Sequence, residues 1–379
     1  MSIFDQKVIK YEMKPLSSLE KVFPDETPVY RMECQMLSGL WGETVSFQVA
    51  YTGDFVMRER LDVRVVSELA EHVHVRTVEM VPVGRATNGI VDDNYLKTIS
   101  GLYPDLLKDL KDGKVIVYSR QWRSLWVDVD ITNEIPAGEY EIELQLIKEG
   151  EVVCSAKQKV TVIGTELPKL EIMHTEWMHA DCLADYYHVE VFSEEHWKLL
   201  GNYFQEYVKR DCNMMLTPLF TSPLDTAIGL ERTTCQLIDV EVKDGEYVFG
   251  FEKLKRWIDL CKKCGIEYFE MSHLFSQWGA KYAPKVVATV NGKKEKIFGW
   301  HTPAIGEYTK FLESFLPQLT AKIRKWEIAD VTYFHISDEP REEHLESYKA
   351  AKESLGNMLD GFHTFDALSS YEFLPSRSN

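Results

Sequence analysis

Two adjacent carboxylates, Asp338 and Glu339, have the residue types and the position that best suit catalysis in this sequence. They end the segment 331–339, in which apolar side chains alternate with polar ones, His335 among the polar. Such alternation predicts a β-strand that packs one face on helices and turns the other towards a polar cleft. In parallel sheets, active sites lie at the carboxyl ends of the strands. The pattern therefore predicts an active site at the end of this strand.

A structural role for one of the two carboxylates is the alternative. Asp338 could cap a helix expected over 341–359, since Asp is a common N-cap and Pro340 suits a first helical turn. A cap accounts for one carboxylate but not for the second one beside it. Both interpretations stay open, and the polar-lined strand favours catalysis.

Paired carboxylates can hydrolyse a glycosidic bond by acid and base catalysis. The usual arrangement holds them about 5 Å or more apart across the sugar ring, which suits sequence neighbours poorly. Adjacent carboxylates better suit a substrate-assisted reaction, in which the 2-acetamido oxygen of the sugar attacks the anomeric carbon. One carboxyl group protonates the leaving oxygen, while its neighbour orients the acetamido group and stabilises its charge. Adjacency therefore indicates an N-acetylated sugar substrate.

The segment from Pro28 to about Gly164 is dominated by short β-rich runs. Strands at this spacing without helices between them predict an antiparallel β-sandwich. The expected strands are 43–51, 61–66, 73–81, 114–118 and 125–131, with a hairpin of 139–147 and 151–163. One exception is the segment 94–112, whose apolar residues recur at helical spacing. We expect this segment to be a long excursion from the β-sandwich.

Beyond about residue 165, strands alternate with helices, which is typical of βα units and a parallel sheet. The expected strands are 170–177, 214–220, 266–274, 330–336 and 361–365. The expected helices are 193–211 with Ser193 as N-cap, 251–263 closed by Gly265, 305–326 and 341–359. Two hairpins are expected, one over 236–250 and one turning at Asn291-Gly292.

These elements amount to about five βα units, which is an incomplete (β/α)₈ TIM-type barrel or an open α/β sheet. We therefore expect a multidomain protein of mixed α and β structure. An N-terminal β-sandwich domain is expected over 1–165, and a β/α-barrel domain lacking its C-terminal part over 166–379.

Three segments carry a resemblance to a known family: His174-Thr-Glu-Trp-Met-His-Ala-Asp-Cys182, Phe192-Ser-Glu-Glu-His-Trp197 and His335-Ile-Ser-Asp-Glu-Pro340. Over 170–370, and more loosely over 28–164, the chain resembles glycoside hydrolase family 123. The resemblance implies a β-sandwich before a barrel, and a retaining, substrate-assisted β-N-acetylgalactosaminidase. It also implies Glu339 as general acid/base and Asp338 as the residue that positions the acetamido group. Family members continue beyond the point that matches Ser370, so later barrel strands are expected to be missing here.

Further residues are expected at the mouth of the barrel, where rings stack on sugars and polar groups bind hydroxyls. They follow the first and third expected strands, close the second hairpin or lie on the strand of the carboxylate pair. The predicted substrate-binding residues are Trp177, His179, Asp181, Tyr186, His273, Trp278, Trp300 and His335. The alternative is that these are ordinary core and loop residues.

A metal site is the rival chemistry at the same place. The residues that could converge on one mouth are His174, His179, Asp181, His335 and Asp338. No two of them have a tight ligand spacing such as H-E-x-x-H, and no glycine-rich phosphate loop stands out. We therefore predict neither a metal nor a cofactor.

Composition restricts the partners. Sixty acidic residues against 43 basic ones give a net charge of −17, which disfavours nucleic acid and anionic membranes. No segment is apolar enough to cross a bilayer, no secretion signal is visible, and seven scattered cysteines do not read as a disulfide framework. These features predict a cytoplasmic protein. Aromatic residues at 12% are compatible with a carbohydrate partner.

The sequence thus predicts a glycoside hydrolase that removes terminal β-linked N-acetylgalactosamine from glycans or glycoconjugates. Its partner would be a glycan containing an N-acetylhexosamine. The alternative is a non-catalytic carbohydrate-binding or scaffold protein, in which an incomplete barrel keeps a groove without turnover.

Overall fold

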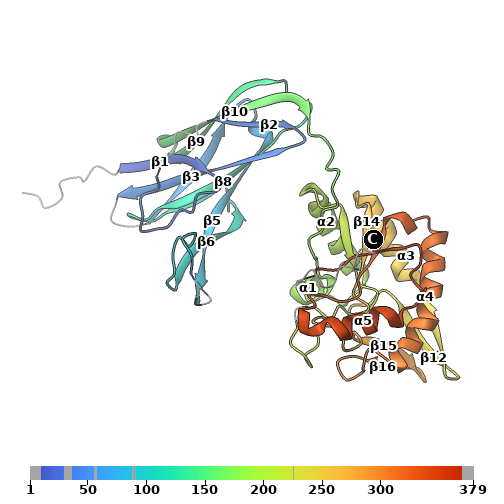
Figure 1. The fold of residues 1–379 in the computed structure, drawn as a ribbon. Coiled ribbons are helices and arrows are strands. Elements are labelled where there is room, and N and C mark those ends of the chain that lie inside the picture. Colours follow the sequence, from blue (N-terminus) through green and yellow to red (C-terminus); the bar gives the residue numbers. More distant parts are fainter. Residues whose placement is uncertain are drawn as a thin grey trace, which may run out of the picture. The chain divides into compact units, whose positions relative to one another are not determined.

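The computed structural model describes residues 10–29, 36–54, 58–87, 89, 91–224 and 226–368. The chain divides into two compact units, Met1–Lys169 and Leu170–Asn379 (Figure 1). Separate hydrophobic cores lie in the two units, which are therefore described one at a time.

Two five-stranded sheets make up the N-terminal unit. In spatial order the first contains β1 (Lys10–Ser17), β3 (Thr44–Asp54), β8 (Arg123–Asp130), β5 (Val73–Val83) and β6 (Gly101–Asp109). The second contains β2 (Met36–Trp41), β10 (Glu151–Glu166), β9 (Gly138–Lys148), β4 (Glu59–Val66) and β7 (Lys114–Val117). Neighbouring strands are antiparallel except β2 and β10, which are parallel. A 3₁₀ helix, η2 (Ala70–His72), precedes β5.

Alternating burial along the strands builds one core from both sheets. Val127 and Val129 of β8 and Ile142 and Leu144 of β9 are fully buried in the same cluster. Side chains two residues apart share a face of a sheet, so each strand contributes one apolar row. Each buried Leu, Ile or Val stabilises the fold by about 1.5–3 kcal/mol relative to an exposed one.

The strands expected in this unit are present with shifted ends, but the expectation for 94–112 is wrong. Residues 101–109 of that segment form β6, paired with β5 from Arg76–Asp109 to Val83–Gly101. Because β6 is the last strand of its sheet and most of its side chains are exposed, it has no buried face. Its apolar residues therefore need not alternate, and their helical spacing was misleading.

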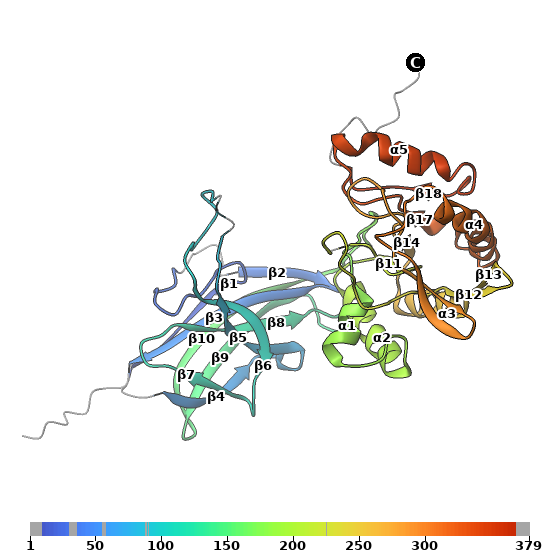
Figure 2. The same ribbon diagram turned by 90° about the horizontal axis from the view of Figure 1, so that it is seen from below.

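Four parallel strands form the central sheet of the C-terminal unit. Their order is β11 (Met214–Thr217), β14 (Tyr268–Met271), β17 (Thr332–Phe334) and β18 (His363–Thr364), as Figure 2 shows. Parallel strands need crossover connections, and helices supply them. The crossover helices are α3 (Glu252–Cys264) before β14, α4 (Glu307–Lys325) before β17 and α5 (Leu345–Ser354) before β18. Two more helices, α1 (Ala180–Tyr187) and α2 (Glu194–Lys209), precede β11.

A second four-stranded sheet is inserted after β11 and β14. Its order is β13 (Glu246–Gly250), β12 (Asp239–Lys243), β15 (Val286–Val290) and β16 (Lys293–Phe298). Both expected hairpins are present. The second turns at Asn291 and Gly292, whose φ angles of 49° and 78° are those of the tight turn that Asn-Gly favours. Both insertions leave the central sheet at the carboxyl ends of its strands.

Two predicted helix ends are confirmed. The hydroxyl of Ser193 accepts a hydrogen bond from the amide of His196 at 3.3 Å and caps α2. Helix α3 ends at Gly265, whose φ of 102° favours glycine. A Cβ there would also lie 3.3 Å from Val208, so the close approach to α2 adds to the preference.

Three parts of this unit differ from expectation. Among the described residues, 170–177 holds no strand: Thr175 makes one isolated parallel bridge with Met214. The amide of His174 binds the side chain of Asn213 at 2.8 Å instead of extending a ladder. The helix expected over 341–359 is α5, which is shorter and follows a 3₁₀ helix, η4 (Glu342–His344), while α1 was not predicted. Within the described ranges, no helix combines the length and apolarity that a membrane crossing needs.

Candidate active site

A cavity of about 340 Å³ lies at the carboxyl ends of β14 and β17. The loop after β14 contributes Trp278 and Tyr282, the segment after β16 contributes Trp300, and the segment after β17 contributes Arg341. The rings of Tyr282 and Trp300 have centroids 6.0 Å apart. The other lining residues are Ile228, Ser276, Gln277, Lys281, Glu343 and His344. Trp278 and Trp300, both predicted to bind substrate, thus belong to one aromatic wall with polar groups beside it.

The backbone near this cavity adopts left-handed conformations that residues other than glycine rarely take. Trp278, Ala280 and Glu339 have φ angles of 58°, 55° and 41°. A non-glycine residue in this conformation costs about 1–3 kcal/mol of folding free energy, so the surrounding structure must hold it there. Such residues cluster at active sites. Between the first two, a Cβ on Gly279 would lie 2.8 Å from His344. The tight loop therefore points to function rather than to stability.

The two adjacent carboxylates lie in different environments. Asp338 is buried, with 8% of its surface exposed, and its carbonyl accepts a hydrogen bond from the amide of Trp278 at 2.9 Å. Glu339 is exposed. The pair therefore combines one carboxylate enclosed by protein with one that is open to solvent.

The capping role considered for Asp338 is wrong. The first helical residue after it is Glu342, and the N-cap is Arg341, three residues beyond Asp338. The expected strand is also shorter, because β17 ends at Phe334. Residues 335–339 instead continue as irregular backbone, and Ser337 is tied to the neighbouring loop by a 2.8 Å hydrogen bond from its hydroxyl to the carbonyl of Ser276.

His335 lies at the centre of a buried ionic group. Its Nδ1 is 3.1 Å from a carboxylate oxygen of Asp366, and its Nε2 bonds to Glu270. Glu270, fully buried, also accepts hydrogen bonds from the indole of Trp177 at 2.6 Å and the hydroxyl of Thr175 at 2.7 Å. Because carboxylates only accept, both ring nitrogens of His335 must donate, and the ring is an imidazolium.

The second carboxylate of this group is equally well bound. Asp366 accepts hydrogen bonds from the amide of Ile336 at 2.9 Å and the hydroxyl of Tyr348 at 2.6 Å. Burial by itself lowers the pKa of His335, but hydrogen bonds to Asp366 and Glu270 and the charges of both outweigh it. They raise the pKa of His335 to about 9.

Protein stability should therefore fall in mildly alkaline solution. The pKa of His335 is about 9 in the fold, against an ordinary value near 6.5. Its contribution is fully present below about pH 6.5 and is lost as the pH rises through 9. The difference amounts to about 3 kcal/mol, to be measured by urea unfolding at pH 6 and pH 9.5. His335→Gln should lose less stability over this range, and an equal loss in both proteins would contradict the assignment.

His273 packs on this group as a neutral ring. It stacks on His335 with centroids 4.1 Å apart and meets the edge of Trp177 at 5.2 Å. Burial first, and then the positive charges of His335 and His179, lower the pKa of His273 well below its usual value. Within the described residues, neither ring nitrogen of His273 has a hydrogen-bond partner. Such unpaired buried atoms are rare, and here they lie at the carboxyl end of β14.

Only Trp278 and Trp300 of the eight predicted substrate-binding residues line the cavity, and Asp338 and Glu339 are not among its lining residues. Trp177, His273 and His335 lie in the buried group described above, and the other three lie on or next to α1. Asp181 is buried in a two-pronged ion pair with Arg232, at 2.8 and 3.0 Å, which links α1 to the loop after β11. Tyr186 is 75% exposed on α1 and packs edge-on against Tyr187. His179 is the N-cap residue of α1 and does not cap it through its side chain. Asp181 therefore has a structural partner, and Tyr186 faces solvent.

Sequence reasoning missed Glu270 and Asp366. For Glu270 a signal exists, because it is a single charge within the four-residue strand β14, which is otherwise Tyr, Phe and Met. A charge in a buried strand needs a partner, and the nearest candidates would have been histidines at neighbouring strand ends. Asp366 lies after β18 in a segment without a pattern of its own.

The five residues considered as metal ligands do not form one ligand group within the described residues. The groups close enough to share an ion there are His174 with Glu176 and Cys212, and His273 with His335 and Asp366. In the second group, a metal would have to displace a ring proton of His335 that is held by the carboxylates of Glu270 and Asp366.

Comparison with known proteins adds independent findings. A family model described as the glycoside hydrolase 123 catalytic domain matches residues 177–378. Among solved structures, the chain is similar to a family 123 glycoside hydrolase from Clostridium perfringens that was studied for glycolipid glycan hydrolysis. The TM-score is 0.69 at 14% identity, over 96% of this chain and 65% of that one, so the chain spans less than two thirds of that enzyme.

A GH5 xyloglucanase from Bacteroides ovatus matches with a TM-score of 0.22 at 8% identity, over 89% of this chain and 64% of that one. That likeness is too weak to indicate a shared fold. A comparison with functionally curated proteins finds no significant match.

Proposed function

Because the chain belongs to glycoside hydrolase family 123, we propose that it is a retaining, substrate-assisted β-N-acetylgalactosaminidase. Its substrate would be a glycan or glycoconjugate with terminal β-linked N-acetylgalactosamine. The observation that carries the proposal is the pair of adjacent carboxylates, Asp338 buried and Glu339 exposed, at the carboxyl end of β17. Two sequence neighbours suit poorly the arrangement in which one carboxylate attacks from across the sugar ring, and the acetamido group of the substrate would take that part.

In the first step, the acetamido oxygen attacks the anomeric carbon while Glu339 protonates the departing glycosidic oxygen. The bond to the aglycone breaks, and a cyclic oxazolinium ion forms. Asp338 accepts the acetamido N–H and stabilises the positive charge that develops on this group. In the second step, Glu339, now a carboxylate, removes a proton from water, which attacks the same carbon and reopens the ring. Two inversions at that carbon give overall retention.

The cavity next to the pair, joined to it by the hydrogen bond from the amide of Trp278 to the carbonyl of Asp338, offers groups that suit a sugar. Trp278 and Trp300 offer flat apolar surfaces for a pyranose ring, and Gln277 and Arg341 line the same cavity with polar groups. We assign the stacking role to the two tryptophans. His273 is buried outside the lining of this cavity, and Trp177 and His335 hold its ring in place.

The fold fits the same proposal. We propose that β11, β14, β17 and β18, with their helical crossovers, are part of a (β/α)₈ TIM-type barrel over 166–379. The two sheets around one core over 1–165 would be the β-sandwich that precedes it. The likeness to the Clostridium perfringens structure, with a TM-score of 0.69, supports both assignments.

Hydrolysis of nitrophenyl β-N-acetylgalactosaminide tests the reaction class. The galacto substrate should be cleaved faster than its gluco epimer, and a galactoside without the acetamido group should not be cleaved. Replacing the acetyl group by trifluoroacetyl should lower kcat/KM by more than about tenfold, because the carbonyl oxygen becomes a weaker nucleophile. Proton NMR should show the β-anomer of the free sugar first.

Two results would contradict the proposal. A rate that does not respond to fluorination would exclude the acetamido group as nucleophile, and an α-anomer as first product would exclude retention. Sugar binding without any cleavage would favour the non-catalytic carbohydrate-binding alternative.

A further inference from the structure

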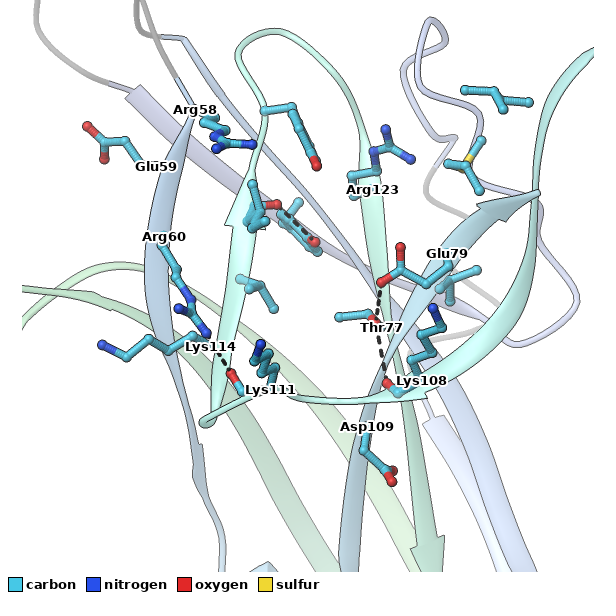
Figure 3. Close-up of a pocket in the computed structure, with 17 residues that line it drawn as sticks. Arg58, Glu59, Arg60, Thr77, Glu79, Lys108, Asp109, Lys111, Lys114 and Arg123 are labelled. Atoms are coloured by element: carbon cyan, nitrogen blue, oxygen red, sulfur yellow. Dashed lines mark hydrogen bonds between the residues drawn. The ribbon is translucent and has the colours of Figure 1, made fainter. Parts of the chain in front are cut away.

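A second and larger cavity, of about 750 Å³, lies in the N-terminal unit. Its walls come from the edges of the two sheets: the start of β4 and β7 on one side, and β5, β6 and the start of β8 on the other (Figure 3). Its volume is more than twice that of the cavity beside Trp278. We call it the basic cleft, and its lining shares no residue with the candidate active site.

Cations predominate in the basic cleft although the protein as a whole is acidic. Six lining residues are basic and three are acidic, in a chain with a net charge of −17. The basic residues are Arg58, Arg60, Lys108, Lys111, Lys114 and Arg123, and the acidic ones are Glu59, Glu79 and Asp109. A concave surface with one predominant sign of charge raises the local concentration of oppositely charged ligands.

Most of this positive charge is not neutralised by carboxylates. Arg60 pairs with Asp112 at 2.9 Å, and Lys114 pairs with Asp62 at 3.3 Å. Among the residues that the structure describes, no ion pair engages the other four cations, Arg58, Lys108, Lys111 and Arg123. These four are therefore the charges that a ligand would meet.

The acidic residues of the cleft are largely occupied. Glu59 pairs with Lys148 at 2.9 Å, and Asp109 lies 3.6 Å from Arg76, neither partner being part of the lining. Glu79 accepts a hydrogen bond from the hydroxyl of Thr77 at 2.8 Å. Arg76 is shared with the closer carboxylate of Asp128, so Glu59 alone is fully matched from outside. Six cations against three acids still leave the cleft with a surplus of positive charge.

Arg123 is the best-defined donor of the basic cleft. Its guanidinium lies 5.0 Å from the ring centre of Tyr118, and one terminal nitrogen donates to Gln121 at 3.2 Å. Its Nε is buried and, within the described residues, has no hydrogen-bond partner. A stacked guanidinium presents a fixed fork of N–H groups that matches the oxygens of a carboxylate or sulfate. Tyr51, almost fully buried, forms part of the floor.

We propose that the basic cleft binds an anionic saccharide, a sugar that carries a carboxylate or a sulfate group. Arg123 and the unpaired lysines Lys108 and Lys111 would take the anionic group, and Tyr118 and Thr77 would contact the sugar. The cavity volume is large enough for several sugar units and far larger than a single inorganic ion needs. The saccharide part rests on the proposed function, because a glycan-processing enzyme meets such ligands. The affinity of the cleft for an anionic group follows from its own charges.

Calorimetric titration of the full chain at low ionic strength tests the proposal. The probes are sialyllactose for the carboxylate, lactose 3′-sulfate for the sulfate, neutral lactose, and sodium sulfate. One or both anionic saccharides should bind, more weakly as salt is added, while lactose and sodium sulfate bind at least about tenfold more weakly. The stronger of the two anionic sugars identifies the charged group that the cleft prefers.

A charge-reversed pair, Lys108→Glu with Lys111→Glu, should weaken this binding at least about tenfold. Both side chains are exposed and form no ion pair with any residue in the described part of the chain, so the fold should tolerate the change. The matched control is Arg64→Glu with Lys159→Glu, two exposed cations of the same unit outside the cleft, with the same change in net charge. The control should bind like the unaltered protein.

Three results would overturn the proposal: no binding of either anionic sugar, equal loss of binding in both double variants, or sodium sulfate binding as tightly as the sugars. Cleavage of neutral nitrophenyl N-acetylgalactosaminide is measured on the same proteins. If no saccharide binds to the cleft, the cleavage activity should still be present. If the activity is absent, the titration still tests binding to the cleft. The two proposals can therefore fail independently of each other.

Discussion

Glu339→Gln should lower kcat on a glycoside with a poor leaving group by about 10²–10⁴-fold. The amide cannot give a proton to the departing oxygen, and the exposed position of Glu339 means that the change should not disturb packing. On nitrophenyl substrates the loss should be smaller in the first step, because nitrophenolate leaves without a proton. The measurement is kcat and kcat/KM for a nitrophenyl glycoside and for a disaccharide.

The matched control is Glu342→Gln, which changes another exposed glutamate, three residues further along at the start of η4. It should keep full activity and the same pH profile. A Glu339→Gln enzyme with unchanged rates on both substrates would exclude Glu339 as the general acid. Asp338→Asn should lower the rate while making it less sensitive to fluorination of the acetyl group, because orientation of that group is lost.

His335→Leu should lower the free energy of unfolding by about 3–5 kcal/mol. The substitution removes the cation that lies between Glu270 and Asp366 in the buried group described above, and leaves two carboxylates without their shared donor. Urea unfolding at pH 6 measures the loss. At that pH the histidine is fully charged in the fold, because its pKa is about 9.

The control for this variant is His363→Leu, an exposed histidine on β18 that stacks on Tyr333 at 4.8 Å. It should cost less than about 1 kcal/mol, as most surface substitutions do. A double variant, His335→Leu with Glu270→Leu, should recover part of the lost stability, because one unpaired charge disappears. Equal effects of His335→Leu and His363→Leu would show that the ionic group does not stabilise the fold.

Features of the fold that depend on neighbouring residues could be predicted from the sequence. The cap at Ser193, the helix end at Gly265 and the turn at Asn291 each follow from backbone preferences within a few residues. A strand ahead of Asp338 and Glu339 could be predicted for the same reason, but it ends at Phe334, earlier than expected. Residues 101–109 were missed because an exposed edge strand has no buried face to create a pattern.

Tertiary features of the candidate site could not be predicted in this way. Glu270 and Asp366 are far from His335 in the chain, and no local preference brings them together. The left-handed conformation of Glu339 opposes the preference of its own residue type, so only packing around it can impose it. The family resemblance could indicate which residues react, but not that His335 would be held as a cation between two acids.

The ionic group around His335 also sets the order in which the C-terminal unit can be completed during synthesis. Glu270 bonds to Thr175, 95 residues earlier, and to His335, 65 residues later, while His335 needs Asp366, 31 residues later still. Contacts this distant form slowly and late. On the ribosome, the emerging chain therefore holds Glu270 without its counter-ion until His335 has been made, and holds the ionic group incomplete until Asp366 follows. Its central sheet should stay open to water, and to chaperones, until residue 366 has left the exit tunnel.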